Sequence, residues 1–373
     1  IKVFGIGLDS LRYNYVSKIF NLFLFLCFLI NSIGYCFGDS NVEDDCILDF
    51  VRYNETYPLT PPRIVGSRFS FKVALIADLE SRARLPFDRY KSKLRFGRLT
   101  INLRSLKVNF RLFSRKQRLI SIYSAGGSGA HFSDLVVYDG KLLTCDRSTG
   151  IVFIIENDGT LTPWIILANG NGRSVHRGFR CEWMTVKDNQ LFVGSSGVAF
   201  KTFNGTWNTN QTYVKRVNVK GLVYHLEWLK RYEKLREVAK IHPDDTLRHE
   251  AVVFDKDSSR WTFLPFVEVI GPIRPKPRQS NNLLLTADRF FHKLDRKKLR
   301  LSGRREYFSS VKVIPGLFEY LPEDIKSIAV GLRVLKTLRK LHTSIVVFTL
   351  PGREILLEDQ WIANEKFTGI EFV

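Results

Sequence analysis

Short apolar runs separated by tight turns recur from about residue 69 to the end of the chain, and this pattern constrains the fold most. The segment Ser133–Ile155 shows it clearly, because two turns join three short apolar strands. Asp139-Gly140 suits the positive φ angles of a two-residue hairpin loop. About twenty such strands, with few helical patterns, predict an all-β propeller or a pair of β-sandwiches.

Two polar residues stand at the start of this segment. Ser133 and Asp134 precede the first apolar run, where a strand that opens toward a central cavity presents ligands. A meander with an acid at its inner end is typical of a propeller blade built around a hard metal ion. We find no sequence repeat of fixed period, so the propeller prediction depends on the strands themselves. One segment differs: Leu226–Ala239 has apolar residues at helical spacing and predicts a short amphipathic helix.

The N-terminal segment carries the features of a targeting sequence. Ile19–Ile30 is a nearly continuous apolar run, preceded by basic residues and followed by small ones. We therefore expect residues 1–38 to be a secretory signal peptide. Because the apolar run can extend to Phe37, an uncleaved signal anchor in a secretory-pathway membrane is the alternative. The polar, proline-containing stretch 39–67 predicts a linker or N-terminal arm, which leaves residues 68–373 for the propeller.

The cysteines limit the covalent cross-links of the mature chain. Cys27 and Cys36 belong to the targeting segment, so Cys46, Cys145 and Cys181 remain. These three permit at most one intramolecular disulfide and leave one free thiol. The chain has no paired Cys or Cys/His spacing, which disfavours zinc.

Three glycosylation sequons agree with secretion. They begin at Asn54, Asn204 and Asn210 and are completed by Thr56, Thr206 and Thr212. We expect a secreted glycoprotein.

The chain is strongly basic. It has 57 Lys and Arg residues against 37 Asp and Glu residues, a net charge of +20. The basic residues cluster in Arg89–Arg118, where they alternate with apolar ones as in a strand pair with one solvated face, and in Arg289–Arg305. These clusters are either solvated surface or a site for heparin-like polyanions. We expect no specific nucleic-acid partner, because the sequence has no base-stacking motif. Nothing in it indicates a stable protein partner.

Several acids and hydroxyls stand inside otherwise apolar strands. They are Asp78, Ser133-Asp134, Glu182, Glu250 and Ser309-Ser310. An unpaired buried carboxylate is costly, so it needs a cation or several hydrogen-bond donors. Oxygen ligands gathered from distant strands are typical of calcium. The motifs Gly-x-Ser-x-Gly, the Walker loop and His-Glu-x-x-His are absent from the sequence.

Seven segments, in one sequence order, resemble the calcium-activated nucleotidase family. This family contains the Cimex-type apyrases of blood-feeding arthropods and their vertebrate secretory-pathway relatives. The segments read FKVALIADLESRAR, FSDLVVYDGKLLTCDRSTGIVFII, GFRCEWMTVKDNQLFVG, RHEAVVFDKDSSRWTFLP, NNLLLTADRFF, FSSVKVIP and FTGIEFV, and they lie within Phe69–Val373. The resemblance implies a five-bladed β-propeller with one Ca²⁺ in its central tunnel. It also implies hydrolysis of nucleoside di- and triphosphates to monophosphate and inorganic phosphate.

The resemblance further implies roles for individual residues. The calcium site would contain Ser133, Asp134, Glu182, Glu250, Ser309 and Thr368. Asp78 falls on an aspartate that lines the same cavity, and either Asp134 or Asp78 would orient the attacking water. The residues that would bind the nucleotide are Arg82, Asp146, Arg147, Asn169, Asn171 and Arg278.

Some of these positions depart from the family pattern. Thr368 stands where the family has a calcium-binding Glu, and Arg147 stands where it has the second of two aspartates. Asn169 and Asn171 replace two further aspartates, and Phe266 replaces an arginine. We expect a secreted Ca²⁺-dependent nucleotidase. The alternative is a catalytically degenerate relative that binds nucleotides or polyanions without turnover.

Overall fold

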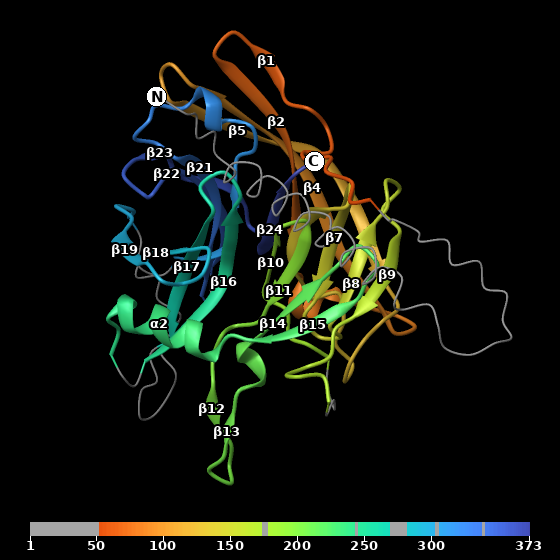
Figure 1. Ribbon diagram of the computed structural model, residues 1–373. Helices are drawn as coiled ribbons and strands as arrows, with labels where there is room; N and C mark the ends of the chain where they lie inside the picture. Colours follow the sequence, from red (N-terminus) through yellow and green to blue (C-terminus); the bar gives the residue numbers. More distant parts are fainter. Residues whose placement is uncertain (1–51, 174–177, 243–244, 269–281, 303–305, 338–339) are drawn as a thin grey trace, which may run out of the picture. The chain divides into compact units, whose positions relative to one another are not determined.

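Our description rests on a computed structural model of the chain (Figure 1). It covers residues 52–173, 178–242, 245–268, 282–302, 306–337 and 340–373. The expected signal segment 1–38, Cys46 and Arg278 lie outside these residues, and their assignments stay predictions. Within them the chain forms strands β1 to β24 and one α-helix, α2 (Leu229–Ala239).

Four blades of the structure are antiparallel four-stranded meanders. Blade 1 contains β6 (Phe132–Tyr138), β7 (Lys141–Asp146), β8 (Ile151–Ile155) and β9 (Leu161–Ile166). Blade 2 contains β10 (Trp183–Lys187), β11 (Gln190–Gly194), β14 (Tyr213–Val217) and β15 (Val223–Glu227). Blade 3 contains β16 (Thr246–Asp255), β17 (Arg260–Glu268), β18 (Leu283–Asp288) and β19 (Leu294–Lys298). Blade 4 contains β20 (Glu306–Val313), β21 (Ser327–Lys336), β22 (Leu341–Leu350) and β23 (Ile355–Ala363).

Blade 5 joins the two ends of the propeller and so closes it. The last strand, β24 (Phe367–Phe372), pairs antiparallel with β2 (Arg68–Ala77). The sheet continues outward with β4 (Arg89–Asn102) and β5 (Lys107–Ser121). Two short strands, β1 (Arg63–Val65) and β3 (Arg84–Leu85), complete it. The five inner strands β24, β6, β10, β16 and β20 contact one another in a closed ring.

The hydrophobic core is divided among the gaps between neighbouring blades. Successive residues of a strand point to opposite faces of its sheet, so each inner strand buries alternate side chains against each neighbour. Leu75 of β2 thus packs toward blade 4, while Ile76 packs toward blade 1. Five buried clusters illustrate this arrangement by one pair each: Leu75 with Ile328, Ile76 with Leu135, Val136 with Met184, Trp183 with Trp261, and Val253 with Phe308.

The predicted all-β, five-bladed propeller is confirmed, and the pair of sandwiches is wrong. The predicted helix is correct from Leu229 to Ala239, but Leu226 belongs to β15 because it pairs with Val214 in the sheet. A small hairpin of β12 (Phe200–Lys201) and β13 (Trp207–Asn208) projects from blade 2 (Figure 1). No helix in the described part of the chain has the length and apolar character needed to cross a membrane.

One disulfide connects two blades. Cys145, at the end of β7, is bonded to Cys181, which lies just before β10. The bond therefore joins blade 1 to the inner strand of blade 2.

Candidate functional site

Bulges in the inner strands place the predicted ligand residues. A β-bulge adds a residue that is left out of the strand ladder and re-aims its side chain. The register shifts in β6, β16, β20 and β24 fall on Ser133-Asp134, Glu250, Ser309 and Thr368, respectively. Glu182 directly precedes the remaining inner strand, β10. Each inner strand thus contributes a buried polar side chain to the site.

Hydrogen bonds between neighbouring strands connect these polar residues. The Thr368 hydroxyl donates to the carbonyl oxygen of Phe132 over 2.6 Å. The Ser309 hydroxyl donates to the carbonyl oxygen of Phe367 over 2.8 Å. Ser133 Oγ donates to the carbonyl oxygen of Cys145 over 3.2 Å. The hydroxyls of Thr368 and Ser309 are therefore held by backbone acceptors of adjacent inner strands, and the hydroxyl of Ser133 is held by β7 of its own blade.

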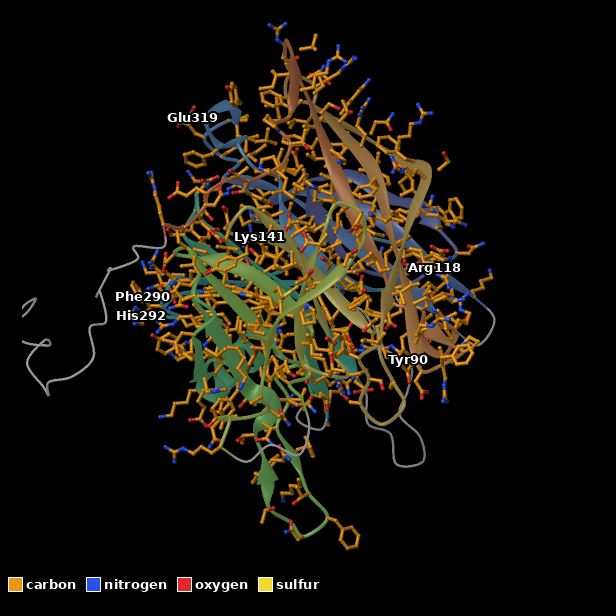
Figure 2. The ribbon with its side chains drawn as sticks, turned by 90° about the vertical axis from the view of Figure 1, so that its right-hand side faces the viewer. Tyr90, Arg118, Lys141, Phe290, His292 and Glu319 are labelled. Carbon is orange, nitrogen blue, oxygen red and sulfur yellow. A yellow bond between two sulfur atoms is a disulfide. The ribbon has the colours of Figure 1, made fainter. Side chains whose placement is uncertain are left out.

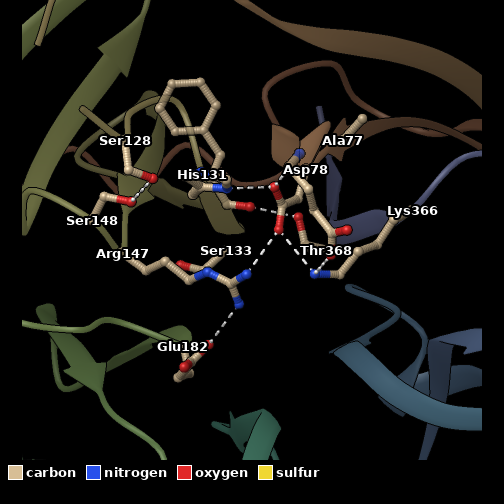
Figure 3. Close-up of polar contacts among 12 residues, drawn as sticks. Ala77, Asp78, Ser128, His131, Ser133, Arg147, Ser148, Glu182, Lys366 and Thr368 are labelled. Carbon is tan, nitrogen blue, oxygen red and sulfur yellow. Dashed lines mark hydrogen bonds and ion pairs between the residues drawn. The ribbon is translucent and has the colours of Figure 1, made fainter. Parts of the chain in front are cut away.

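Asp78 is the centre of the polar cluster (Figure 3). It follows β2 and is fully buried. Its Oδ1 lies 2.8 Å from Nδ1 of His131, and its Oδ2 accepts hydrogen bonds from Arg147 Nη2 at 3.0 Å and Lys366 Nζ at 2.9 Å. Burial alone would raise the pKa of Asp78, but these three partners hold it well below its usual value. Asp78 is therefore a carboxylate at physiological pH.

Arg147 connects Asp78 with a second buried acid. Its Nη1 lies 3.6 Å from Glu182 Oε2, while its Nη2 binds Asp78 (Figure 3). Burial opposes the charge, but the carboxylates of Glu182, Asp78 and Glu250 raise the pKa of Arg147. Glu182 also accepts a 2.8 Å hydrogen bond from Arg180 Nε, and the pKa of Glu182 is lowered because both guanidinium groups outweigh its burial. The centre thus contains a fixed cation between two acids.

His131 belongs to this cluster although the sequence did not single it out. Its loop is held by Asp146, whose Oδ1 accepts the backbone N–H groups of His131 at 3.2 Å and Ser148 at 2.9 Å. Asp146 Oδ2 accepts the N–H of Ala130 at 3.2 Å. Asp146 was expected to meet the nucleotide. Here it orders the loop that brings His131 to Asp78.

The apyrase family model matches residues 77–373 of this chain. The chain belongs to the apyrase family. It is 33% identical to soluble calcium-activated nucleotidase 1 of Rattus norvegicus, over 86% of this chain and 78% of the rat protein. It is 30% identical to the apyrase of Cimex lectularius, over 91% of this chain and 90% of that protein. It is also 30% identical to the apyrase of Phlebotomus duboscqi, over 82% and 89% respectively. The predicted family is confirmed.

Asp134 of this apyrase-family chain has its own set of partners. Its Oδ2 accepts hydrogen bonds from Lys312 Nζ at 3.1 Å and Met184 N at 2.9 Å, and its Oδ1 accepts one from Ser310 Oγ at 3.0 Å. Burial raises the pKa of Asp134 despite the nearby Lys312. None of the contacts found among the described residues joins Asp134 to Asp78 or Arg147. Asp134 thus ties blades 1, 2 and 4 together.

None of the contacts found in the described parts of the chain joins Arg82, Asn169 or Asn171, which were also expected to contact the nucleotide, to Asp78. Arg82 is exposed on the short turn Glu80–Ala83. Asn169 and Asn171 use their side-chain oxygens to hold a turn, accepting the N–H groups of Gly170 and Arg173 at 3.0 Å each. The amides that replace the family's aspartates therefore preserve the loop.

The donor set of the described residues does not fit a calcium ion. No group of three or more His, Cys, Asp or Glu side chains in these residues is placed to hold a metal. Ca²⁺ takes six to eight oxygen ligands, and these come from carboxylates, carbonyl groups and water. Here the Glu182 carboxylate already forms ion pairs with the guanidinium groups of Arg147 and Arg180. The Asp134 carboxylate forms an ion pair with Lys312. The Arg147 guanidinium stands beside the acids that the metal would need.

Proposed function

We propose that this apyrase-family chain hydrolyses nucleoside di- and triphosphates to monophosphate and inorganic phosphate. The observation that supports this most is the convergence of Arg147, Lys366 and His131 on the single carboxylate of Asp78. Phosphoryl transfer needs fixed positive charge near the phosphate oxygens and a group that positions water. This cluster contains both.

Arg147 is the proposed phosphate-binding group. Its side chain is 18% exposed, whereas that of Lys366 is only 3% exposed. A guanidinium offers several N–H donors in one plane, so it can bind phosphate oxygens while it keeps its contacts with Asp78 and Glu182. Arg180, 44% exposed and bonded to Glu182, supplies a second cation at the entrance. Lys366 stabilises the Asp78 carboxylate from the buried side.

His131 is the proposed base. If its Nδ1 carries the proton, it donates to Asp78 Oδ1 and leaves Nε2 as an acceptor for a water proton. The Asp78 carboxylate then orients the ring and stabilises the imidazolium that forms. Asp78 itself is a weak base, because its pKa is held well below the usual range. Its proposed role is to position His131, which changes the direct role expected from the sequence.

Calcium enters no step of this proposal. The names of some relatives state calcium activation, but the acids of this chain are already paired with cations. Secretion is proposed on the expected signal segment and the sequons. Asn54 and Asn204 are exposed, as glycan attachment requires. The alternative of binding without turnover is less favoured, because the acid, the histidine and the cations of the centre are assembled.

Phosphate release from ADP, ATP and UDP by the purified full chain tests the proposal. We expect turnover by the parent protein and its loss in His131→Asn. His292→Asn is the matched control, since the His292 side chain is 75% exposed on blade 3. Absence of turnover with every nucleotide, or equal activity of His131→Asn and the parent, would contradict the proposal.

A further inference from the structure

A row of basic side chains lines the outer edge of blade 5. We define the basic edge as the eight exposed residues Arg89, Arg98, Arg104, Lys107, Arg111, Arg115, Lys116 and Arg118 on β4, β5 and their connection. Figure 2 shows Arg118 at the margin of the molecule. No Asp or Glu occurs in the sequence from Arg89 to Ser133. The edge therefore has a single sign of charge.

Within the described ranges of the chain, these cations have no acidic partners. None of the eight forms an ion pair with a carboxylate of the described residues, although blade 5 has such pairs elsewhere, as between Lys93 and Glu365. In the second basic cluster, Arg289 pairs with Asp188 at 2.6 Å, and Asp295, which lies inside the cluster, pairs with Arg260 of β17 at 2.6 Å. The second cluster thus contains an acid and an ion pair, whereas the described residues of the basic edge contain neither.

The register of β4 and β5 places like charges directly opposite each other. Arg98 faces Arg111, and Arg95 faces Lys116. Lys93 likewise faces Arg118. Like charges at opposed positions of an antiparallel pair destabilise it. A bound anion would remove this repulsion, so the pattern fits a surface that binds anions better than one shaped for stability alone.

Protection of the strand edge explains only part of this pattern. β5 pairs with β4 alone, and charged side chains on an edge strand prevent pairing with other chains. Alternating acidic and basic side chains would protect the edge equally well. They would also place opposite charges across from each other on β4 and β5, so that the two strands attract each other. A single sign over this whole length is therefore not accounted for by edge protection.

The shape of the basic edge matches a linear polyanion. From Lys107 to Arg118 the row follows one extended strand for about 36 Å. No exposed large apolar side chain lies between Phe87 and Ile120, so the exposed apolar side chains of this region flank the row and do not interrupt it. Phe96 and Phe113 are only partly exposed, and Lys72 and Arg98 lie over their rings, so neither ring offers the exposed platform that base stacking uses. β4 is paired on both sides, so the strand pair is not free to enter a DNA groove.

We propose that the basic edge binds a sulfated linear polysaccharide of the heparin type. The surface is independent of the proposed nucleotidase, since none of its residues contacts Asp78. Guanidinium groups bind the planar oxygens of sulfate through paired N–H donors, and lysines add charge. Binding should weaken steeply with salt, because the contacts are exposed.

Heparin binding by the full chain tests this inference. The edge variant Arg111→Gln, Arg115→Gln, Lys116→Gln, Arg118→Gln loses four charges from the row. A matched variant, Lys230→Gln, Lys293→Gln, Lys298→Gln, Arg300→Gln, loses four exposed charges from blade 3 and its helix. At 0.15 M salt we expect at least about 10-fold weaker heparin binding by the edge variant and little change in the matched variant. Unchanged phosphate release by both variants reports that the fold is intact.

Four results would overturn the inference. Equal weakening in both variants would mean that only net charge matters. Unaltered binding by the edge variant would place the heparin site elsewhere. Tighter binding to phosphatidylserine vesicles or to RNA than to heparin would assign the edge to another partner. Equal binding of desulfated and native heparin would exclude recognition of sulfate.

Discussion

Arg147 Nη2 donates a 3.0 Å hydrogen bond to Asp78 Oδ2 in the buried centre of the propeller. The other nitrogen of the same guanidinium lies 3.6 Å from Glu182. A cation that belongs to the chain therefore stands between two acids of the site. The family resemblance gives this position to an aspartate and position 368 to a glutamate. Both changes remove negative charge, and we infer that the Arg147 guanidinium supplies positive charge that a bound cation would otherwise supply.

Removal of the Arg147 charge should abolish activity and weaken the fold. Arg147→Gln leaves Asp78 with Lys366 as its one full cationic partner and leaves Glu182 with Arg180. Loss of one partner of a buried charge pair costs about 3–5 kcal/mol. We expect urea unfolding to show a loss of this size and phosphate release from ADP to vanish. Arg147→Lys should recover stability better than activity, because it keeps the charge but not the planar fork. Full activity in Arg147→Gln would refute this role.

Restoration of the family's acids should create a calcium site. The double variant Arg147→Asp, Thr368→Glu adds one carboxylate beside Glu182 and another on β24, where the Thr368 hydroxyl now bonds to Phe132. We expect this variant, but not the parent, to bind Ca²⁺ in isothermal titration calorimetry. Its unfolding free energy should rise by about 2.7 kcal/mol when free calcium reaches 100 times the dissociation constant. Calcium binding of equal strength by both proteins would contradict the reading of Arg147 as a substitute cation.

Glu371 should make the stability of the protein fall between acidic and neutral pH. Burial raises the pKa of Glu371 to about 7, against the attraction of Lys312 3.9 Å away. A carboxyl with a raised folded-state pKa stabilises the fold below its unfolded pKa, and this contribution is lost as pH rises through 7. The loss is on the order of 3 kcal/mol. Urea unfolding at several pH values should show this decrease in the parent and not in Glu371→Gln. An equal decrease in both would assign it to other groups.

Asp78 should act in the opposite direction at low pH. Its folded-state pKa is well below the usual value because of His131, Lys366 and Arg147. Its contribution to stability is therefore complete above about pH 5 and is lost as pH falls. We expect Asp78→Asn to be less stable than the parent at pH 7, with a difference that begins to shrink only below about pH 4 and shrinks further as pH falls. A constant difference at all pH values would show that the charge of Asp78 is not what stabilises the site.

The disulfide should stabilise the site region by limiting the unfolded chain. Cys145 and Cys181 are 36 residues apart, so their bond removes loop entropy worth about 3–4 kcal/mol. We expect the free energy of unfolding of Cys145→Ser, Cys181→Ser to be lower by this amount, so the variant should unfold at a lower urea concentration than the parent. Glu182 directly follows Cys181, so activity should fall together with stability. The same midpoint for the variant and the parent would show that the two cysteines are not bonded in solution.

The sequence predicted the fold well because the fold depends on local patterns. Short apolar runs and turn dipeptides such as Asp139-Gly140 identify strands wherever they lie in the chain. The closure between β24 and β2 joins residues about 300 positions apart, and no local pattern in the sequence indicated it. The boundary between β15 and α2 was predicted incorrectly, because Leu226 fits both the helical spacing and the strand pairing.

The site was predicted only in part, for a related reason. Buried acids such as Asp78 and Glu182 were recognisable because a carboxylate in an apolar strand needs a partner. Their partners were not recognisable: His131 lies in a glycine-rich loop, and Lys366 precedes the last strand. Asp134 looked equivalent to Asp78, yet Lys312, 178 residues away, pairs with it and separates it from the cluster. Ion pairs between distant strands depend on the tertiary structure, so local sequence patterns do not predict them.

The central claim is that Arg147 has taken the place of calcium in this site. The direct test is phosphate release from ADP by the full chain after removal of bound metal, with either EGTA or millimolar calcium present. We expect turnover in EGTA at a rate that added calcium does not change, and its loss in His131→Asn under both conditions. Turnover that disappears in EGTA and returns with calcium would contradict the claim.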